Sequence, residues 1–158
     1  MSSQVLSEQT NCVQAFVALL RAHAASTRRL SAQLTADHGL TISDFEVLLR
    51  LARAPDRRMR RVDLAEQVVL TASGVTRLLD GLERSGLVER DSCDTDRRVV
   101  YAVLTDAGLE KVRGAATSHF AQVDEMFGAR FDEDEVARLG SLLERLSPAD
   151  PAETCDPG

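Results

Sequence analysis

The sequence predicts a mainly α-helical protein with one small β-hairpin. Three observations support this fold class. Apolar residues recur every three or four positions in several long stretches, one short region is instead rich in β-branched residues, and turn-forming residues separate the two patterns. The 158 residues, 44% hydrophobic and 28% charged, have the size and composition of one globular domain. We therefore expect residues 1–158 to fold as a single domain without a disulfide or metal staple.

Periodicity and capping signals predict the first two helices. Residues 12–37 carry apolar side chains at helical spacing, and Gly39 is expected to end this long helix. Ser43 and Glu46 stand three residues apart in front of an apolar run, which predicts a capping box at the start of a second helix. This second helix should end near Pro55.

Two short helices follow an arginine-rich loop at residues 56–61. The first is predicted over residues 62–69, and Thr71 is expected to cap the second, which ends at Gly86. Because almost nothing separates the two helices, they should meet at a tight turn.

The next segment is a predicted β-hairpin. Residues 87–91 and 98–105 are strand-like, and the polar, aspartate-rich residues between them favour a turn. A helix-turn-helix followed by a hairpin is the winged arrangement, which we assign to residues 41–105.

Two more helices are expected after the hairpin. Thr105 and Asp106 should cap the first, and Asp132 with Glu135 forms a capping box for the second. Together with residues 12–37, the helices of residues 106–147 lie outside the winged segment. Residues 148–158 are expected to form a flexible tail.

The charge is distributed unevenly along the chain. The net charge of −6 argues at first against a nucleic-acid partner, because binding phosphate needs a positive face. The segment from Arg53 to Arg98, however, holds ten arginines and nine acidic residues, a net charge of +1, so the acidity belongs to the rest of the chain. Solvated charged loops would explain the arginines equally well.

The segment after Thr71 has the composition of a DNA-reading helix. In a helix-turn-helix, the first residues of the second helix meet base edges in the major groove, so they must be small or hydrogen-bonding. Ser73, Thr76 and Arg77 are candidate donors, and Gly74 would permit close approach. An ordinary capped surface helix is the alternative.

Two stretches of the sequence resemble a known protein family. The stretch LAEQVVLTASGVTRLLDGLERSGLVERDSCDTDRRVVYAVLTDAG resembles the winged-helix core of the MarR family of bacterial transcription regulators, and LTISDFEVLLRLA is similar to the family's second helix. The resemblance implies a homodimer that binds a palindromic operator, places its recognition helix in the major groove and often releases DNA on binding a small aromatic compound or on oxidation.

The resemblance also assigns roles to arginines outside the recognition helix. Asp96 and Arg98 match a wing pair in which the carboxylate braces an arginine directed into the minor groove, and Arg97 would lie nearer a phosphate. A surface ion pair of little consequence is the alternative. Arg60 and Arg61 have a weaker match; phosphate contacts are expected, with a solvated loop as the alternative.

Other classes of function are not indicated. The three scattered cysteines, Cys12, Cys93 and Cys155, suit a reducing compartment, so we expect a cytoplasmic protein. The histidines lack metal-ligand spacing, and no catalytic motif or membrane-spanning run is present, so we expect no metal, no cofactor, no enzyme activity and no membrane contact.

We therefore expect a sequence-specific repressor of transcription. It should bind double-stranded DNA as a homodimer formed through residues 12–37 and 106–147. The alternative is a winged-helix protein-interaction module that has lost operator binding, which the acidic total keeps open. A small aromatic or amphipathic anion is expected to release the operator, and its site is assigned to His23, Thr27, Arg28 and Phe45.

Overall fold

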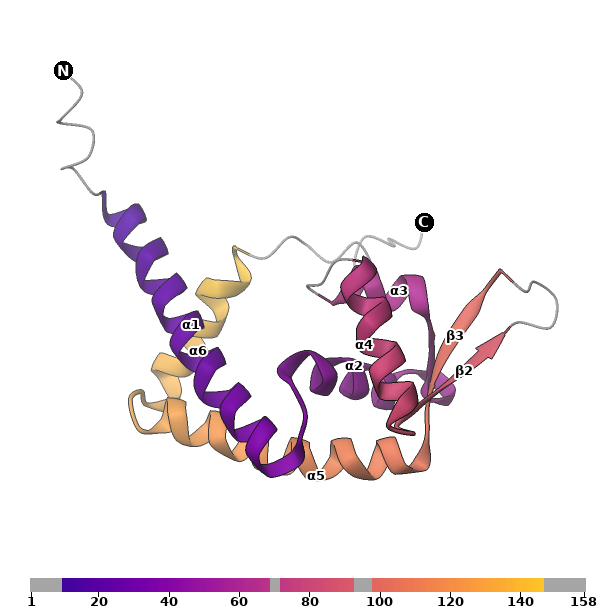
Figure 1. The fold of residues 1–158 in the computed structure, drawn as a ribbon. Coiled ribbons are helices and arrows are strands. Elements are labelled where there is room, and N and C mark those ends of the chain that lie inside the picture. The colour runs from indigo at the N-terminus through magenta and orange to yellow at the C-terminus, as the bar shows by residue number, and fades with distance from the viewer. Residues whose placement is uncertain (1–9, 69–71, 93–97, 147–158) are drawn as a thin grey trace, which may run out of the picture. The chain divides into compact units, whose positions relative to one another are not determined.

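The computed structural model describes residues 10–68, 72–92 and 98–146. The chain packs as two compact units, Met1–Phe120 and Ala121–Gly158. In the described residues, helices dominate and one small antiparallel sheet accompanies them, which confirms the predicted fold class (Figure 1).

The first helix matches its prediction closely. Helix α1 spans Asn11–His38, and the hydroxyl of Thr10 caps its first turn by accepting the Val13 amide. Gly39 ends the helix in the left-handed conformation, with φ of 65°. Glycine adopts this conformation without the steric cost that a Cβ would bring.

Helix α2 spans Ile42–Arg53, but its predicted capping box is wrong. The cap is Thr41, whose hydroxyl accepts the Asp44 amide at 3.1 Å, while the Asp44 carboxylate accepts the Thr41 amide at 2.9 Å. The helix begins earlier than predicted because Thr41, two residues after the left-handed Gly39, has the extended backbone of an N-cap. Ser43 therefore lies inside the helix, and Glu46 pairs with Arg50 at 2.9 Å.

The arginine-rich segment is more ordered than the expected loop. Pro55–Arg57 forms a 3-10 turn and Arg58–Arg60 forms strand β1. Helix α3 (Arg61–Gln67) follows at once, and helix α4 (Ala72–Arg84) lies beyond residues 69–71, which are outside the described residues. A three-residue strand with no β-branched side chain leaves no pattern in the sequence, and β1 exists because it pairs with a distant strand.

The predicted hairpin is present as strands β2 (Val88–Ser92) and β3 (Val100–Leu104). The sheet order is β1-β3-β2, with both pairings antiparallel. Strand β3 is central, so its Ala102 is fully buried. The sheet thus joins the start of the helix-turn-helix to the wing.

Helix α5 spans Asp106–Gly128 and begins at the predicted cap. The Thr105 hydroxyl accepts the Gly108 amide at 3.0 Å and donates to the Gly86 carbonyl at 2.8 Å. The Thr105 side chain therefore caps α5 and also connects it to Gly86, in the turn that follows α4.

Helix α6 spans Glu133–Glu144 and belongs to the second unit. Its capping box is the predicted one, because the Asp132 carboxylate accepts the Glu135 amide at 2.8 Å and the Glu135 carboxylate accepts the Asp132 amide at 3.1 Å. The rings of Phe127 and Phe131 lie 6.1 Å apart just before this helix.

The buried core of the first unit is wholly apolar among the described residues. It draws on the end of α1 and on α2, α3, α4, β2, β3 and the first half of α5. The helices of the described residues include none with an 18-residue stretch apolar enough for a membrane crossing. Likewise, within residues 10–68, 72–92 and 98–146 no three His, Cys, Asp or Glu side chains gather in a way that could hold a metal ion.

Candidate nucleic-acid interface

Helix α4 has one face in the core and one face in solvent. Val75, Leu79 and Leu82 are at most 4% exposed and anchor the helix. Thr76 and Arg77, on the other side, are exposed. An apolar anchor that holds a hydrogen-bonding face outward is what groove insertion requires.

The predicted base-reading residues all belong to the first two turns of α4. Gly74 is half-buried, and the side chain of Ser73 lies outside the described residues. The Arg77 side chain is exposed, and its guanidinium has no hydrogen bond or ion pair to another described residue. Both Thr76 and Gly74 already interact within the protein.

The tip of the wing is only partly described. Asp96 and Arg97 fall in residues 93–97, outside the described residues, so the predicted Asp96–Arg98 brace stays a prediction. Arg98 is exposed and stands two residues before β3 begins.

The two arginines that flank the start of α3 differ in their partners. Arg60 is exposed and donates to both carboxylate oxygens of Asp63, at 2.7 and 2.8 Å, and this pairing raises the pKa of Arg60 above its ordinary value. Arg61 is largely buried, with 15% of its side chain exposed, and reaches Glu83 at 2.8 Å and Asp80 at 3.3 Å.

Arg90 of β2 also contacts the two acidic side chains of α4. Its guanidinium lies 3.4 Å from Asp80 and 3.6 Å from Glu83. Asp80, Glu83 and Arg90 were not among the residues predicted from the sequence. The spacing of two acids on one helix face was visible, but nothing local in the sequence indicates which arginines meet them.

A second basic contact supports the wing from the β1 side. The guanidinium of Arg58 stacks over the Tyr101 ring, 4.0 Å from its centroid, and lies 3.4 Å from the Asp91 carboxylate. Tyr101 and Asp91 face each other across the β2–β3 ladder. Arg58 therefore links all three strands of the sheet.

The four residues assigned to effector binding come from two helices, α1 and α2. His23 and Thr27 contact each other along α1, with Nε2 and Oγ1 3.5 Å apart, and Arg28 is exposed. Phe45 is 5% exposed and packs against the His119 ring, whose centroid lies 4.8 Å away.

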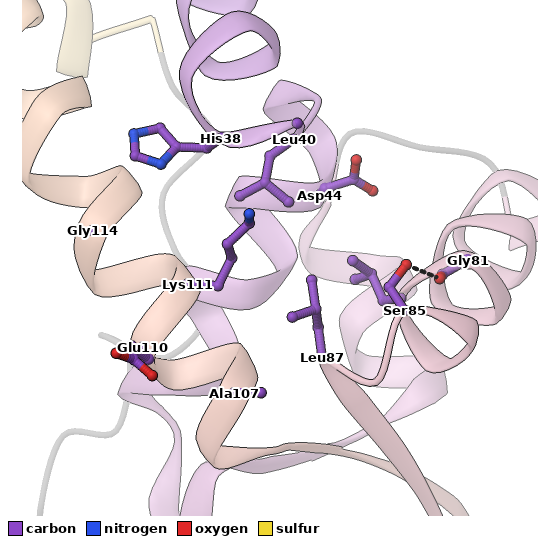
Figure 2. Close-up of a pocket in the computed structure, with 12 residues that line it drawn as sticks. His38, Leu40, Asp44, Gly81, Ser85, Leu87, Ala107, Glu110, Lys111 and Gly114 are labelled. Atoms are coloured by element: carbon purple, nitrogen blue, oxygen red, sulfur yellow. Dashed lines mark hydrogen bonds between the residues drawn. The ribbon is translucent and has the colours of Figure 1, made fainter.

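An open cavity of about 800 Å³ lies elsewhere in the first unit (Figure 2). Its lining comes from the α1–α2 junction, the end of α4 and the first half of α5, and it includes His38, Leu40, Leu87 and Lys111. Lys111, the only lysine of the chain, extends from α5 toward Leu40. Its ammonium group has no hydrogen bond or ion pair to any described residue.

Comparison with known proteins identifies relatives of the whole arrangement. The sequence pattern of the MarR family matches residues 40–100. The chain is similar to the HTH-type transcriptional repressor YetL of Bacillus subtilis, with 34% identity over 115 residues that cover 71% of this chain and 69% of YetL. It is also similar to the HTH-type transcriptional regulator MhqR of the same organism, with 28% identity over 83% of this chain and 88% of MhqR.

Two solved structures from Streptomyces coelicolor have the same fold. AbsC, a MarR family transcriptional regulator, superposes with a TM-score of 0.79 at 31% identity and covers 88% of this chain and 94% of its own. Sco3205, a MarR family transcriptional regulator solved in complex with DNA, superposes with a TM-score of 0.81 at 28% identity and covers 90% of this chain and 92% of its own.

Proposed function

The chain belongs to the MarR family of transcription regulators, and from this membership we infer that it represses transcription by binding a palindromic operator. The observation that carries the proposal is helix α4, which is anchored by buried leucines and presents Thr76 and Arg77 to solvent. On this proposal the chain acts on the chromosome in the cytoplasm and performs no catalytic reaction.

A role at the DNA is proposed for four arginines of the winged segment, namely Arg60, Arg77, Arg97 and Arg98. Arg77 reads a base edge in the major groove, since a guanidinium matches the two acceptors of guanine. Ser73, Gly74 and Thr76 lie against the same groove. Arg98, braced by Asp96, enters the minor groove, and Arg97 and Arg60 contact phosphates.

A homodimer is proposed because apolar surface stays uncovered in each unit. On α1, Val13, Phe16 and Leu20 are 44%, 59% and 51% exposed, and their spacing places them on one face. In the second unit, Phe131, Val136, Leu142, Leu143 and Leu146 are exposed. A second copy would cover these faces through residues 12–37 and 106–147.

The direct test selects duplexes from a random pool and measures their binding by mobility shift between 50 and 200 mM salt. We expect enrichment of a palindrome and binding that weakens with salt, because each phosphate contact releases counterions. Light scattering should give twice the mass of one chain. A dimer that selects no sequence would favour the alternative, a winged-helix module that binds another protein.

We also propose that a small aromatic or amphipathic anion releases the operator. The cavity of Figure 2 supports this, since it pairs apolar side chains with the ammonium group of Lys111, which no other described residue binds. The site assigned to His23, Thr27, Arg28 and Phe45 would require the buried Phe45 ring to move.

Titration with salicylate, followed by calorimetry and by operator release, distinguishes these two sites. Lys111→Met should weaken salicylate binding if the cavity holds it, whereas Arg28→Met should do so if the α1 site holds it. Because binding and release are linked, the factor by which salicylate weakens operator binding must equal the factor by which the operator weakens salicylate binding. An unchanged operator affinity at saturating salicylate would contradict release by this ligand.

A further inference from the structure

Four charged side chains form a network that connects three elements of the winged segment. Arg61 begins α3, Asp80 and Glu83 lie on α4, and Arg90 lies on β2. Arg61 reaches Glu83 at 2.8 Å and Asp80 at 3.3 Å. Arg90 reaches the same two carboxylates at 3.4 and 3.6 Å. Each acid of α4 therefore lies between an arginine from α3 and an arginine from the wing.

Burial makes this network different from an ordinary surface ion pair. The side chains of Arg61 and Glu83 are 15% and 23% exposed, whereas freely exposed pairs contribute little. The two Nη groups of Arg61 donate to two different carboxylates, and the rigid planar fork of the guanidinium fixes the directions of these two contacts, which the freely rotating ammonium of a lysine does not. Removing Arg61 would leave the half-buried Glu83 with Arg90, 3.6 Å away, as its remaining partner in the network.

The network acts on the face of α4 that is proposed to read DNA. Asp80 follows Thr76 by four residues and Arg77 by three, so these side chains share one side of the helix. A restraint on Asp80 therefore restrains the rotation of Arg77 about the helix axis. The arginines also neutralise two carboxylates that would otherwise repel phosphate near the same groove.

We propose that Arg61 and Arg90 are positioning residues that set the orientation of α4, and that Arg61 acts on DNA binding through α4 rather than by contacting a phosphate. The proposal rests on the proposed function, since it concerns how that interface is held. It gives Arg61 a role different from that of Arg60, which is exposed and pairs with Asp63, three positions later in the chain.

The test compares Arg61→Met with the matched variant Arg60→Met. Operator and random-sequence duplexes are titrated at several salt concentrations. Arg61→Met should lower the ratio of operator to random binding by roughly tenfold and leave the salt slope unchanged. Arg60→Met should weaken both duplexes alike and lower the slope by about one per protomer. Arg61→Lys, which keeps the charge and one contact, should fall between wild type and Arg61→Met.

A second readout does not need DNA. Amide hydrogen exchange of the free full-length protein should become faster in α4 and β2 in both Arg61→Met and Arg90→Met, and stay as in wild type in Arg60→Met. A salt slope that falls in Arg61→Met, or exchange in α4 that does not change, would overturn the positioning role. If wild type binds no duplex, the proposed function fails, and the exchange measurement still decides whether the network holds α4.

Discussion

The imidazole Nε2 of His38 lies 2.7 Å from the hydroxyl oxygen of Ser118. The Ser118 hydroxyl also lies 3.2 Å from the Ala115 carbonyl, and when it donates its hydrogen there the histidine Nε2 is the donor in the contact between the two side chains. This hydrogen bond joins the last turn of α1 to α5 within the first unit, beside the cavity that His38 lines.

Ser118→Ala should lower the free energy of unfolding by about 1 kcal/mol, because the partly buried His38 imidazole loses its hydrogen-bond partner. Urea denaturation at a fixed protein concentration measures the change. Thr117→Ala is the matched control, since the exposed Thr117 hydroxyl donates to the Arg113 carbonyl of its own helix. Equal effects of the two variants would contradict an inter-helix role for Ser118.

Gly108→Ala should destabilise the fold by about 1 to 3 kcal/mol. A Cβ on Gly108 would collide with the backbone carbonyl of Leu87 and stand 2.7 Å from a Leu104 methyl group. On the same helix, Gly114→Ala meets nothing within 4 Å and should stabilise by up to about 1 kcal/mol through helix propensity. The melting temperatures of the two variants should therefore shift in opposite directions. A neutral Gly108→Ala would mean that α5 can move away from the Leu87 carbonyl.

Thr41→Ala should cost about 1 kcal/mol of stability, because it removes the cap of α2. Ser43→Ala, at the position that the sequence pattern suggested as the cap, should change the free energy of unfolding by less than about 0.5 kcal/mol. Urea denaturation of both variants ranks the two sites. A larger loss in Ser43→Ala would restore the original capping prediction.

His119 should make the protein less stable in mild acid. Burial lowers the pKa of His119 below its ordinary value, and its Nδ1 has no hydrogen-bond partner in the described structure. The stabilising contribution is complete above the unfolded pKa of about 6.5 and is lost as the pH falls from there toward the lower folded pKa. His119→Gln should therefore lose less stability than wild type between about pH 7 and pH 5, and parallel pH curves would exclude this contribution.

Arg77→Ala and Arg98→Ala should affect DNA binding differently. Loss of a base contact by Arg77 should cost about 1 to 3 kcal/mol and relax the preference at one position of each half-site. Arg98→Ala should weaken binding broadly and lower the salt slope by about one per protomer. Selection from a random pool and salt titration distinguish the two patterns, and wild-type operator binding by Arg98→Ala would contradict the assignment of the wing.

The sequence was sufficient for most of the element order. Helix α1 and its stop at Gly39, the α6 capping box and the two strands of the hairpin all follow from hydrogen bonds and apolar spacing within a few residues. Such signals involve residues close together in the chain, so they can be recognised from the sequence alone. Strand β1 was missed because its three residues become a strand only through pairing with β3, more than forty positions later.

The candidate site also has a part that could be predicted from the sequence and a part that could not. The exposed face of α4 could be predicted, since period 3.6 decides which side of a helix is buried. The partners of Arg61 could not, because Asp80 and Glu83 lie 19 and 22 residues away. Many acids in this chain could equally have met that guanidinium. By itself the sequence determined which helices and strands form and which of their faces are apolar; only the tertiary structure decided which charges meet, because ion pairs between elements depend on how the packed core orients those elements.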